Sequence, residues 1–161
     1  MIYEVTGDIL LSKAQLIVHG VAPHDHFTNG LALALRERWP SMVKDFRHYC
    51  HNQNPKTGDA WLWGGPQIRI ANLLTQEPSE KEGGLPGKAS LSSIRHSLDK
   101  LKKMIEDEKF TSVYLPKIAT GVLWLNWSDL NPIIYEKLGV LNIQLIIYAQ
   151  FTAREAAKES L

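Results

Sequence analysis

The chain has 161 residues, of which 44% are hydrophobic and 22% are charged, a composition typical of one soluble globular domain. It has 18 Lys and Arg against 17 Asp and Glu, so its net charge of +1 gives no bulk electrostatic basis for binding duplex nucleic acid or an anionic membrane. Cys50 is the only cysteine, which excludes an internal disulfide, and no apolar run reaches the length of a membrane span. We therefore expect a cytoplasmic monomer with a single domain over residues 1–161, including a short polar tail from about residue 152.

The first third of the chain alternates strand and helix patterns. Short β-rich apolar segments at residues 2–5 and 16–18 predict two strands before residue 20. From Gly30 the apolar spacing becomes helical, and this helix should end near Pro40 because proline disfavours helical geometry in the residue before it. Ser41 is then placed to cap a second helix, in which apolar residues recur at three- and four-residue spacing.

The middle of the chain contains its clearest hairpin pattern. Residues 57–65 and 66–75 read as two strands around a Gly-Gly-Pro turn. Proline, glycine and charged residues are concentrated from Glu77 to Lys88, and they predict a surface loop within the domain.

The second half continues the alternation of helices and strands. Ser90 is placed to cap an amphipathic helix, whose apolar positions are Leu91, Ile94, Leu98, Leu101 and Ile105. A strand at 112–116, a helix at 127–138 followed by Gly139, and a buried strand at 143–151 complete the chain. Strands that alternate with helices, apart from one hairpin, predict an α/β sandwich with a mixed sheet. Ligands of such sheets tend to bind at loops beyond the carboxyl ends of the strands.

Three segments that follow strands are candidates for ligand contact. Asp8 could accept a hydrogen bond from a purine amine, or it could be a turn residue that bonds its own backbone. The segment from Gly20 to Gly30 leads into a helix, and amides at a helix start can bind a phosphate. The segment from Pro116 to Trp127 contains small residues that would let a ligand approach, or it could be a tight connection that packs the core. Taken singly, each segment is better explained as structure.

A cluster of titratable residues raises the alternative of a metal site. Six residues of types that bind metals occur in two groups, His24, Asp25 and His26 followed by His48, Cys50 and His51. The His-x-His spacing is a weak zinc signal, and helical periodicity already explains the second group. We expect no metal ion, and a solvated loop tip remains open as the structural interpretation of the first group.

Taken together, the segments resemble the macro domain family. The likeness is carried by "GDIL", "VHG", "NGLALAL", "WP", "LLT", "LPKIATGVLWLNW" and "YAQF", and it extends from Ile2 to Phe151. The chain is most similar to the branch containing terminal ADP-ribose protein glycohydrolase and the DNA ADP-ribosyl glycohydrolase antitoxins. The resemblance implies a three-layer α/β/α sandwich around a mixed, mostly parallel six-stranded sheet. It also implies that ADP-ribose or an ADP-ribosylated macromolecule is the partner.

The resemblance assigns parts of the ligand to parts of the chain. Asp8 would hold the adenine amine, and Phe151 would stack on the ring. The segment from Gly20 to Gly30 would wrap the distal ribose. Backbone amides from Ala119 to Leu123 would cradle the diphosphate, in keeping with the near-zero net charge. The implied ligand-binding residues are Asp8, Ile9, Gly20, Val21, Asn29, Gly30, Leu31, Ala119, Thr120, Gly121, Val122, Leu123 and Phe151.

The chain departs from this branch at the catalytic positions. Where the terminal glycohydrolase has a nucleophilic lysine and an assisting acid, this chain has Gln76 and Leu123. A shift of one residue would place Glu77 at the first position, a carboxylate but still no lysine, so the resemblance implies no covalent lysine mechanism. A hydrolase would then need Asp25 or His24 to activate a water molecule. The other two hypotheses are a non-catalytic binder of ADP-ribose and a ligand-free scaffold for protein interaction. None of the three requires a cofactor.

Overall fold

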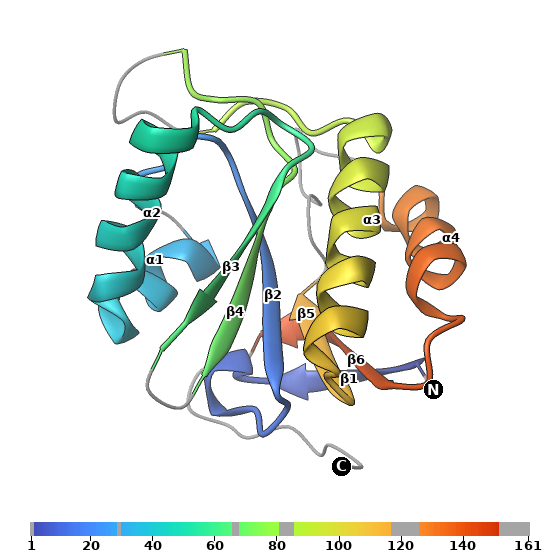
Figure 1. Cartoon of the computed structure of the whole chain (residues 1–161). Helices are drawn as coiled ribbons and strands as arrows, with labels where there is room; N and C mark the ends of the chain where they lie inside the picture. The colour runs from blue at the N-terminus through green and yellow to red at the C-terminus, as the bar shows by residue number, and fades with distance from the viewer. Residues whose placement is uncertain (1, 29, 66–67, 81–85, 117–125, 152–161) are drawn as a thin grey trace.

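The computed structural model describes residues 2–28, 30–65, 68–80, 86–116 and 126–151 (Figure 1). The strands are β1 (Ile2–Gly7), β2 (Leu16–Val21), β3 (Ala60–Gly64), β4 (Arg69–Leu74), β5 (Ser112–Pro116) and β6 (Gln144–Phe151). The helices are the short 3-10 helix η1 (Ile9–Leu11) and α1 (Gly30–Arg38), α2 (Pro40–Gln53), α3 (Leu91–Glu108) and α4 (Trp127–Leu138). The order of strands and helices along the chain agrees with the pattern in the sequence.

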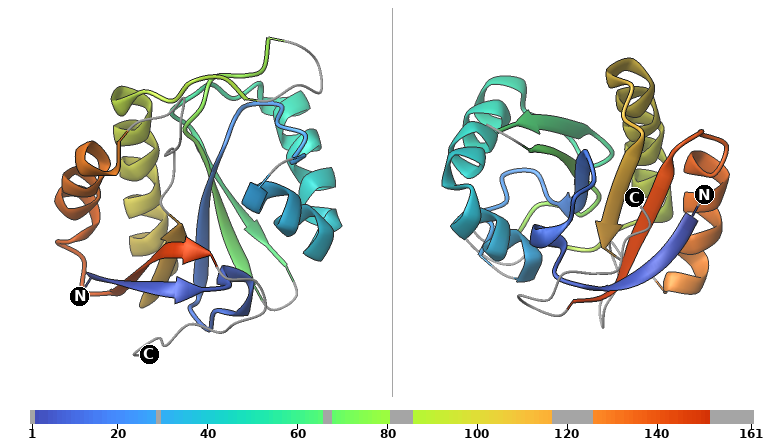
Figure 2. Two further views of the ribbon diagram at one scale, coloured as in Figure 1. Left: turned by 180° about the vertical axis from the view of Figure 1, so that it is seen from behind. Right: turned by 90° about the horizontal axis from the view of Figure 1, so that it is seen from below.

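The six strands form one sheet in the order β1-β6-β5-β2-β4-β3. β3 pairs with β4 in antiparallel orientation, which confirms the predicted hairpin, and the other neighbouring pairs are parallel. Helices α1 and α2 cover one face of the sheet, and α3 and α4 cover the other (Figures 1 and 2). The predicted three-layer α/β/α sandwich with a mixed, mostly parallel sheet is therefore confirmed.

Each face of the sheet has its own hydrophobic core, because side chains alternate between the two faces of a strand. In β2, Leu16 and Val18 join the core beneath α3 and α4, whereas Ile17 and Val21 join the core beneath α1 and α2. All four side chains are fully buried. Burial on both faces explains why this strand reads as a nearly continuous apolar run.

The helix ends follow local rules with one correction. The Ser90 hydroxyl accepts a hydrogen bond from the Ser93 amide at 3.1 Å, so the predicted cap of α3 is confirmed. The predicted cap at Ser41 is wrong: α2 begins at Pro40, after Trp39, and Ser41 lies inside the first turn. Proline is favoured at the first helical position because its fixed φ suits the helix and the amide hydrogen it lacks would have no partner there.

The predicted loop from Glu77 to Lys88 is closed at its base. The amide of Glu77 donates to the carbonyl of Lys88 at 2.9 Å, and Gln76 forms an isolated bridge with Ala89. This segment therefore leaves the sheet after β4 and returns to α3 within one domain. Of the described helices, none is both long enough and apolar enough to pass through a membrane.

Candidate functional site

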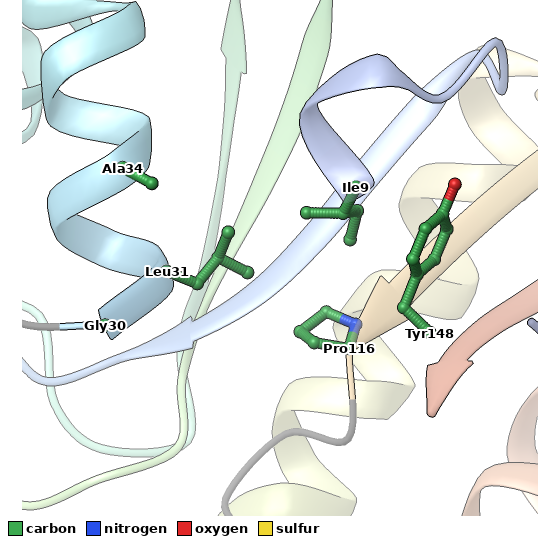
Figure 3. Close-up of a pocket in the computed structure, with 6 residues that line it drawn as sticks. All are labelled: Ile9, Gly30, Leu31, Ala34, Pro116 and Tyr148. Atoms are coloured by element: carbon green, nitrogen blue, oxygen red, sulfur yellow. The ribbon is translucent and has the colours of Figure 1, made fainter. Parts of the chain in front are cut away.

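A pocket of about 380 Å³ lies between α1, η1 and the strands β5 and β6 (Figure 3). Its described lining consists of Ile9, Gly30, Leu31, Ala34, Pro116 and Tyr148. The side chains of Leu31 and Ala34 point from α1 toward Ile9 across the pocket (Figure 3). We call this hollow the larger pocket. Its apolar walls suit a flat or apolar part of a small molecule.

Strand order explains how distant residues meet in this pocket. Pro116 ends β5 and stands opposite Tyr148 of β6 in the parallel register. Ile9 follows β1, whose last residues pair with the end of β6. The carboxyl ends of neighbouring parallel strands meet at one edge of a sheet, which is the usual position of ligand sites in such folds.

Asp8 directly precedes Ile9, which lines the larger pocket, and is the N-cap of η1. Its Oδ1 atom accepts a hydrogen bond from the Leu10 amide at 2.9 Å, and the residue is buried. The turn interpretation of this aspartate is therefore confirmed for one carboxylate oxygen. Its contact with a purine amine stays a prediction.

Gly30 and Leu31 stand where the predicted helix begins, and both line the larger pocket. Gly30 has a φ of +58°, and no atom lies within 4 Å of the position that a Cβ would take. Glycine is therefore favoured here by the left-handed backbone rather than by lack of space. Asn29, which was predicted beside it, lies outside the described residues.

Gly20 and Val21 lie in a strand and not in the following loop. β2 continues to Val21, where these two residues pair with Leu73 and Leu74 of β4. The Val21 carbonyl accepts hydrogen bonds from the amides of Thr75 and Gln76 at 3.0 and 3.3 Å. The segment from Gly20 to Gly30 was expected to be a loop from its first residue, and this needs correction. Its first two residues still pair with β4, so the loop begins at Ala22.

The loop over residues 22–28 is organised by Asp25. Its Oδ2 atom accepts from the Ala22 amide at 3.1 Å, and its Oδ1 atom accepts from the Phe27 amide at 2.9 Å. His24 and Phe27 adopt left-handed backbone conformations with φ of 59° and 56°. Such conformations cost non-glycine residues about 1–2 kcal/mol each, so the carboxylate stabilises a loop that is locally unfavourable.

A second hollow of about 150 Å³ lies between this loop and α2, and we call it the smaller pocket. It is lined by His24, Asp25, His26, Arg47, Cys50 and His51. Although many of these side chains can ligate metals, the described residues contain no group of three or more His, Cys, Asp or Glu arranged to hold a metal ion. The structure thus brings His24 and Asp25 together, but in a hollow other than the one that Ile9, Gly30 and Leu31 line.

Two buried groups near the smaller pocket have shifted pKa values. Burial raises the pKa of the Cys50 thiol, while a backbone hydrogen bond with His24 acts in the opposite direction. Burial also lowers the pKa of His19 to about 4, against the opposing effects of a hydrogen bond to Asn72 and the charge of Asp25. The thiol therefore stays protonated and is a weak nucleophile, and His19 is neutral at physiological pH.

Ala119, Thr120, Gly121, Val122 and Leu123 lie outside the described residues. Phe151 ends β6 and pairs with Gly7, and the stacking of its ring on adenine stays a prediction.

Three residues that line the larger pocket were missed by sequence reasoning: Ala34, Pro116 and Tyr148. Ala34 follows Leu31 by three residues, a spacing that places both on one helix face and could have revealed it. Pro116 was predicted only as the end of a strand and the first residue of the candidate segment 116–127, and Tyr148 only as a strand residue, since the sequence has no local signal for their pairing.

Gln76, which the sequence resemblance places at the position of a nucleophilic lysine, is held by its backbone. Its amide donates to Val21, and its carbonyl accepts from the Thr57 hydroxyl at 3.2 Å. A carboxamide does not provide the amine that a covalent mechanism requires. The backbone of Gln76 therefore joins neighbouring segments, and its side chain has no amine to act as a nucleophile.

The fold and this site define an α/β domain with a pocket at the carboxyl ends of its parallel strands. The model of the Macro domain family matches residues 12–134, and the chain belongs to this family.

Among curated relatives, the chain is 21% identical over 145 residues to ADP-ribose 1''-phosphate phosphatase of Candida albicans, covering 84% of this chain and 93% of that protein. It is 24% identical over 131 residues to DNA ADP-ribosyl glycohydrolase of Mycobacterium bovis, covering 81% of this chain. The match spans 37% of the length of the mycobacterial protein.

Solved structures show the same fold. The macrodomain of Thermus aquaticus DarG superimposes with a TM-score of 0.79 at 19% identity, over 92% of this chain and 98% of that one. Thermosipho africanus DarTG in complex with ADP-ribose gives a TM-score of 0.77 at 17% identity, over 96% of this chain and 42% of that one.

Proposed function

We propose that the protein binds ADP-ribose, or an ADP-ribosyl group on a macromolecule, in the larger pocket. The observation that carries this proposal is a hollow of about 380 Å³ with apolar walls, placed at the strand ends beside the start of α1. Membership in the macro domain family supports the choice of ligand. So does the named substrate of the fungal relative, an ADP-ribose phosphate, and the bound ADP-ribose of the Thermosipho structure.

The pocket's chemistry suits the parts of this ligand. The walls formed by Ile9, Leu31 and Pro116 would receive the purine, with Asp8 accepting a hydrogen bond from its amine. The N-terminus of α1 at Gly30 provides backbone amides and the positive end of the helix dipole for phosphate oxygens. Backbone amides from Ala119 to Leu123 would complete the diphosphate cradle. This mode of binding needs no cofactor, and we place it in a cytoplasmic monomer.

Hydrolysis of an ADP-ribose linkage is a second candidate function, since both curated relatives are named as hydrolases. Lacking the lysine nucleophile, such an enzyme would use His24 or Asp25 to activate water. These side chains line the smaller pocket, so a bound ligand would have to extend toward the loop to reach them. The alternative of a ligand-free scaffold for protein interaction requires that Leu123 or Trp124 fill the cleft, and both lie outside the described residues.

Calorimetric titration with ADP-ribose tests the proposal, using wild type, Asp8→Asn and Asp45→Asn. Asparagine at position 8 keeps an oxygen for the Leu10 amide but loses the charge, so we expect affinity to fall about tenfold. Asp45 is the matched control, because it lies on α2 and is absent from the described lining of the larger pocket. Its carboxylate accepts a hydrogen bond from the Trp63 side chain at 2.8 Å. Wild type that releases no heat at millimolar ADP-ribose would overturn the proposal. Assays of ester- and base-linked ADP-ribose substrates on the same preparation separate a binder from a hydrolase.

A further inference from the structure

The loop over residues 22–28 brings the chain from β2 to the larger pocket. Three residues that line this pocket, Gly30, Leu31 and Ala34, belong to the helix that the loop leads into. They form one wall, which faces Ile9 across the hollow (Figure 3). The conformation of the loop therefore sets where that wall stands.

Asp25 ties the two ends of the loop together. Its carboxylate accepts hydrogen bonds from Ala22, the first residue after β2, and from Phe27, which lies three residues before α1. Hydrogen bonds from backbone amides to an ionised carboxylate are stronger than those between neutral groups. The two bonds span the left-handed turn at His24, which would otherwise favour other conformations.

Phe27 fixes the same part of the loop from the core side. Its side chain is fully buried, with ring centroids 5.2 Å from Phe46 and 5.7 Å from His19 in edge-to-face geometry. Asp25 holds the amide of this residue while the core holds its ring. Loss of the carboxylate would remove the bonds to Ala22 and Phe27. The loop would then be held by the buried ring, by the Asp25 amide on the Ala22 carbonyl at 3.2 Å, and by Arg36 on the His26 carbonyl at 3.4 Å.

We propose that Asp25 is a positioning residue for the larger pocket, which acts through the loop backbone rather than by touching the ligand. The proposal rests on the proposed function, because the pocket it serves is the ADP-ribose site. Asp25 lines the smaller pocket and is absent from the described lining of the larger one, so its influence passes through Phe27 and the start of α1. This role differs from the acid-base role that the sequence predicts.

Hydrogen exchange without ligand and ADP-ribose titration test this role in Asp25→Ala and Asp25→Asn. In Asp25→Ala, we expect the amides of Ala22 and Phe27 to exchange about tenfold faster and the Kd for ADP-ribose to rise about tenfold. Asp25→Asn retains one acceptor oxygen and should recover part of both effects. Asp45→Ala is the matched control: it loses a carboxylate hydrogen bond to Trp63 and some stability, but it should keep wild-type loop exchange and affinity.

Three outcomes would overturn the positioning role. Wild-type exchange and affinity in Asp25→Ala would show that the carboxylate does not hold the loop. Retained affinity with lost turnover would assign Asp25 to the chemistry instead. If wild type has no affinity for ADP-ribose, the proposed function and this role fail together. The exchange measurement needs no ligand, so it still shows whether the Asp25 carboxylate holds the loop.

Discussion

The two pockets differ in composition: the reactive residue types, which the sequence suggests as markers of the ligand site, line the smaller pocket and not the larger one. The smaller pocket gathers three histidines, an aspartate, an arginine and the only cysteine. The larger pocket is walled by aliphatic and aromatic side chains together with a glycine and a proline. Yet the larger one has the volume, the strand-end position and the helix start that a small-molecule ligand needs.

The comparison teaches that reactive residue types do not by themselves mark a site. Both Asp25 oxygens accept backbone hydrogen bonds, and burial keeps the Cys50 thiol protonated. These groups serve the conformation of the loop, which in turn supports the larger pocket. Three variants would break or sharpen this distinction, and they are described from the largest expected effect to the smallest.

Truncation of the loop's anchor should have the largest effect. Phe27→Ala removes a fully buried ring packed on Phe46 and His19, so we expect the free energy of unfolding to fall by about 3–5 kcal/mol, measured by urea denaturation. Leu98→Ala, a core truncation on the opposite face of the sheet, should cost about 2–5 kcal/mol and leave exchange in residues 22–28 unaltered. A loss below about 1 kcal/mol in Phe27→Ala would contradict the anchoring role.

Acidification should destabilise the folded protein through His19, which lies near the smaller pocket. The pKa of His19 is lowered from 6.5 to about 4 by burial, so between these values the unfolded chain binds a proton that the folded chain does not. Protonation of His19 therefore does not reduce the free energy of unfolding above pH 6.5. As the pH falls toward 4, it should lower the free energy of unfolding by up to about 3 kcal/mol.

Urea denaturation from neutral to acidic pH measures this effect in wild type and His19→Gln. The variant keeps a polar side chain beside Asn72, whose Oδ1 lies 2.6 Å from His19 Nε2, but it removes the titrating group. We expect the free energy of unfolding of the variant to depend less on pH in this range. Asp25, the charged neighbour of His19, is present in both proteins and does not account for the difference between them. Parallel pH profiles for the two proteins would show that His19 is not the group responsible.

Filling the larger pocket should affect binding more than stability. Ala34 points into the hollow from α1, so Ala34→Phe would place a ring in the space proposed for ADP-ribose (Figure 3). We expect affinity to fall about thirtyfold, or about 2 kcal/mol, in a calorimetric titration. Lys103→Phe adds the same ring at an exposed position of α3, on the opposite face of the sheet, and should bind as wild type does. Equal affinities in the two variants would place the ligand elsewhere.

Much of the fold could be predicted because its signals are local. The helical spacing from Leu91 to Ile105 and the cap at Ser90 depend on residues within a few positions of one another. The correction at Ser41 was also local, since Pro40 takes the first helical position. Of the predicted site residues, Ile9, Gly30 and Leu31 line the larger pocket, whereas His24 and Asp25 line the smaller one.

The sequence by itself determined the alternation of strands and helices, because periodic burial is written in neighbouring residues. Only the tertiary structure decided that β5 lies beside β6, which brings Pro116 opposite Tyr148. It also decided that the Asp25 carboxylate faces loop amides at 2.9 and 3.1 Å, where its sequence neighbours suggested acid-base chemistry. Strand order and side-chain direction arise from contacts between distant segments, and no local pattern specifies them.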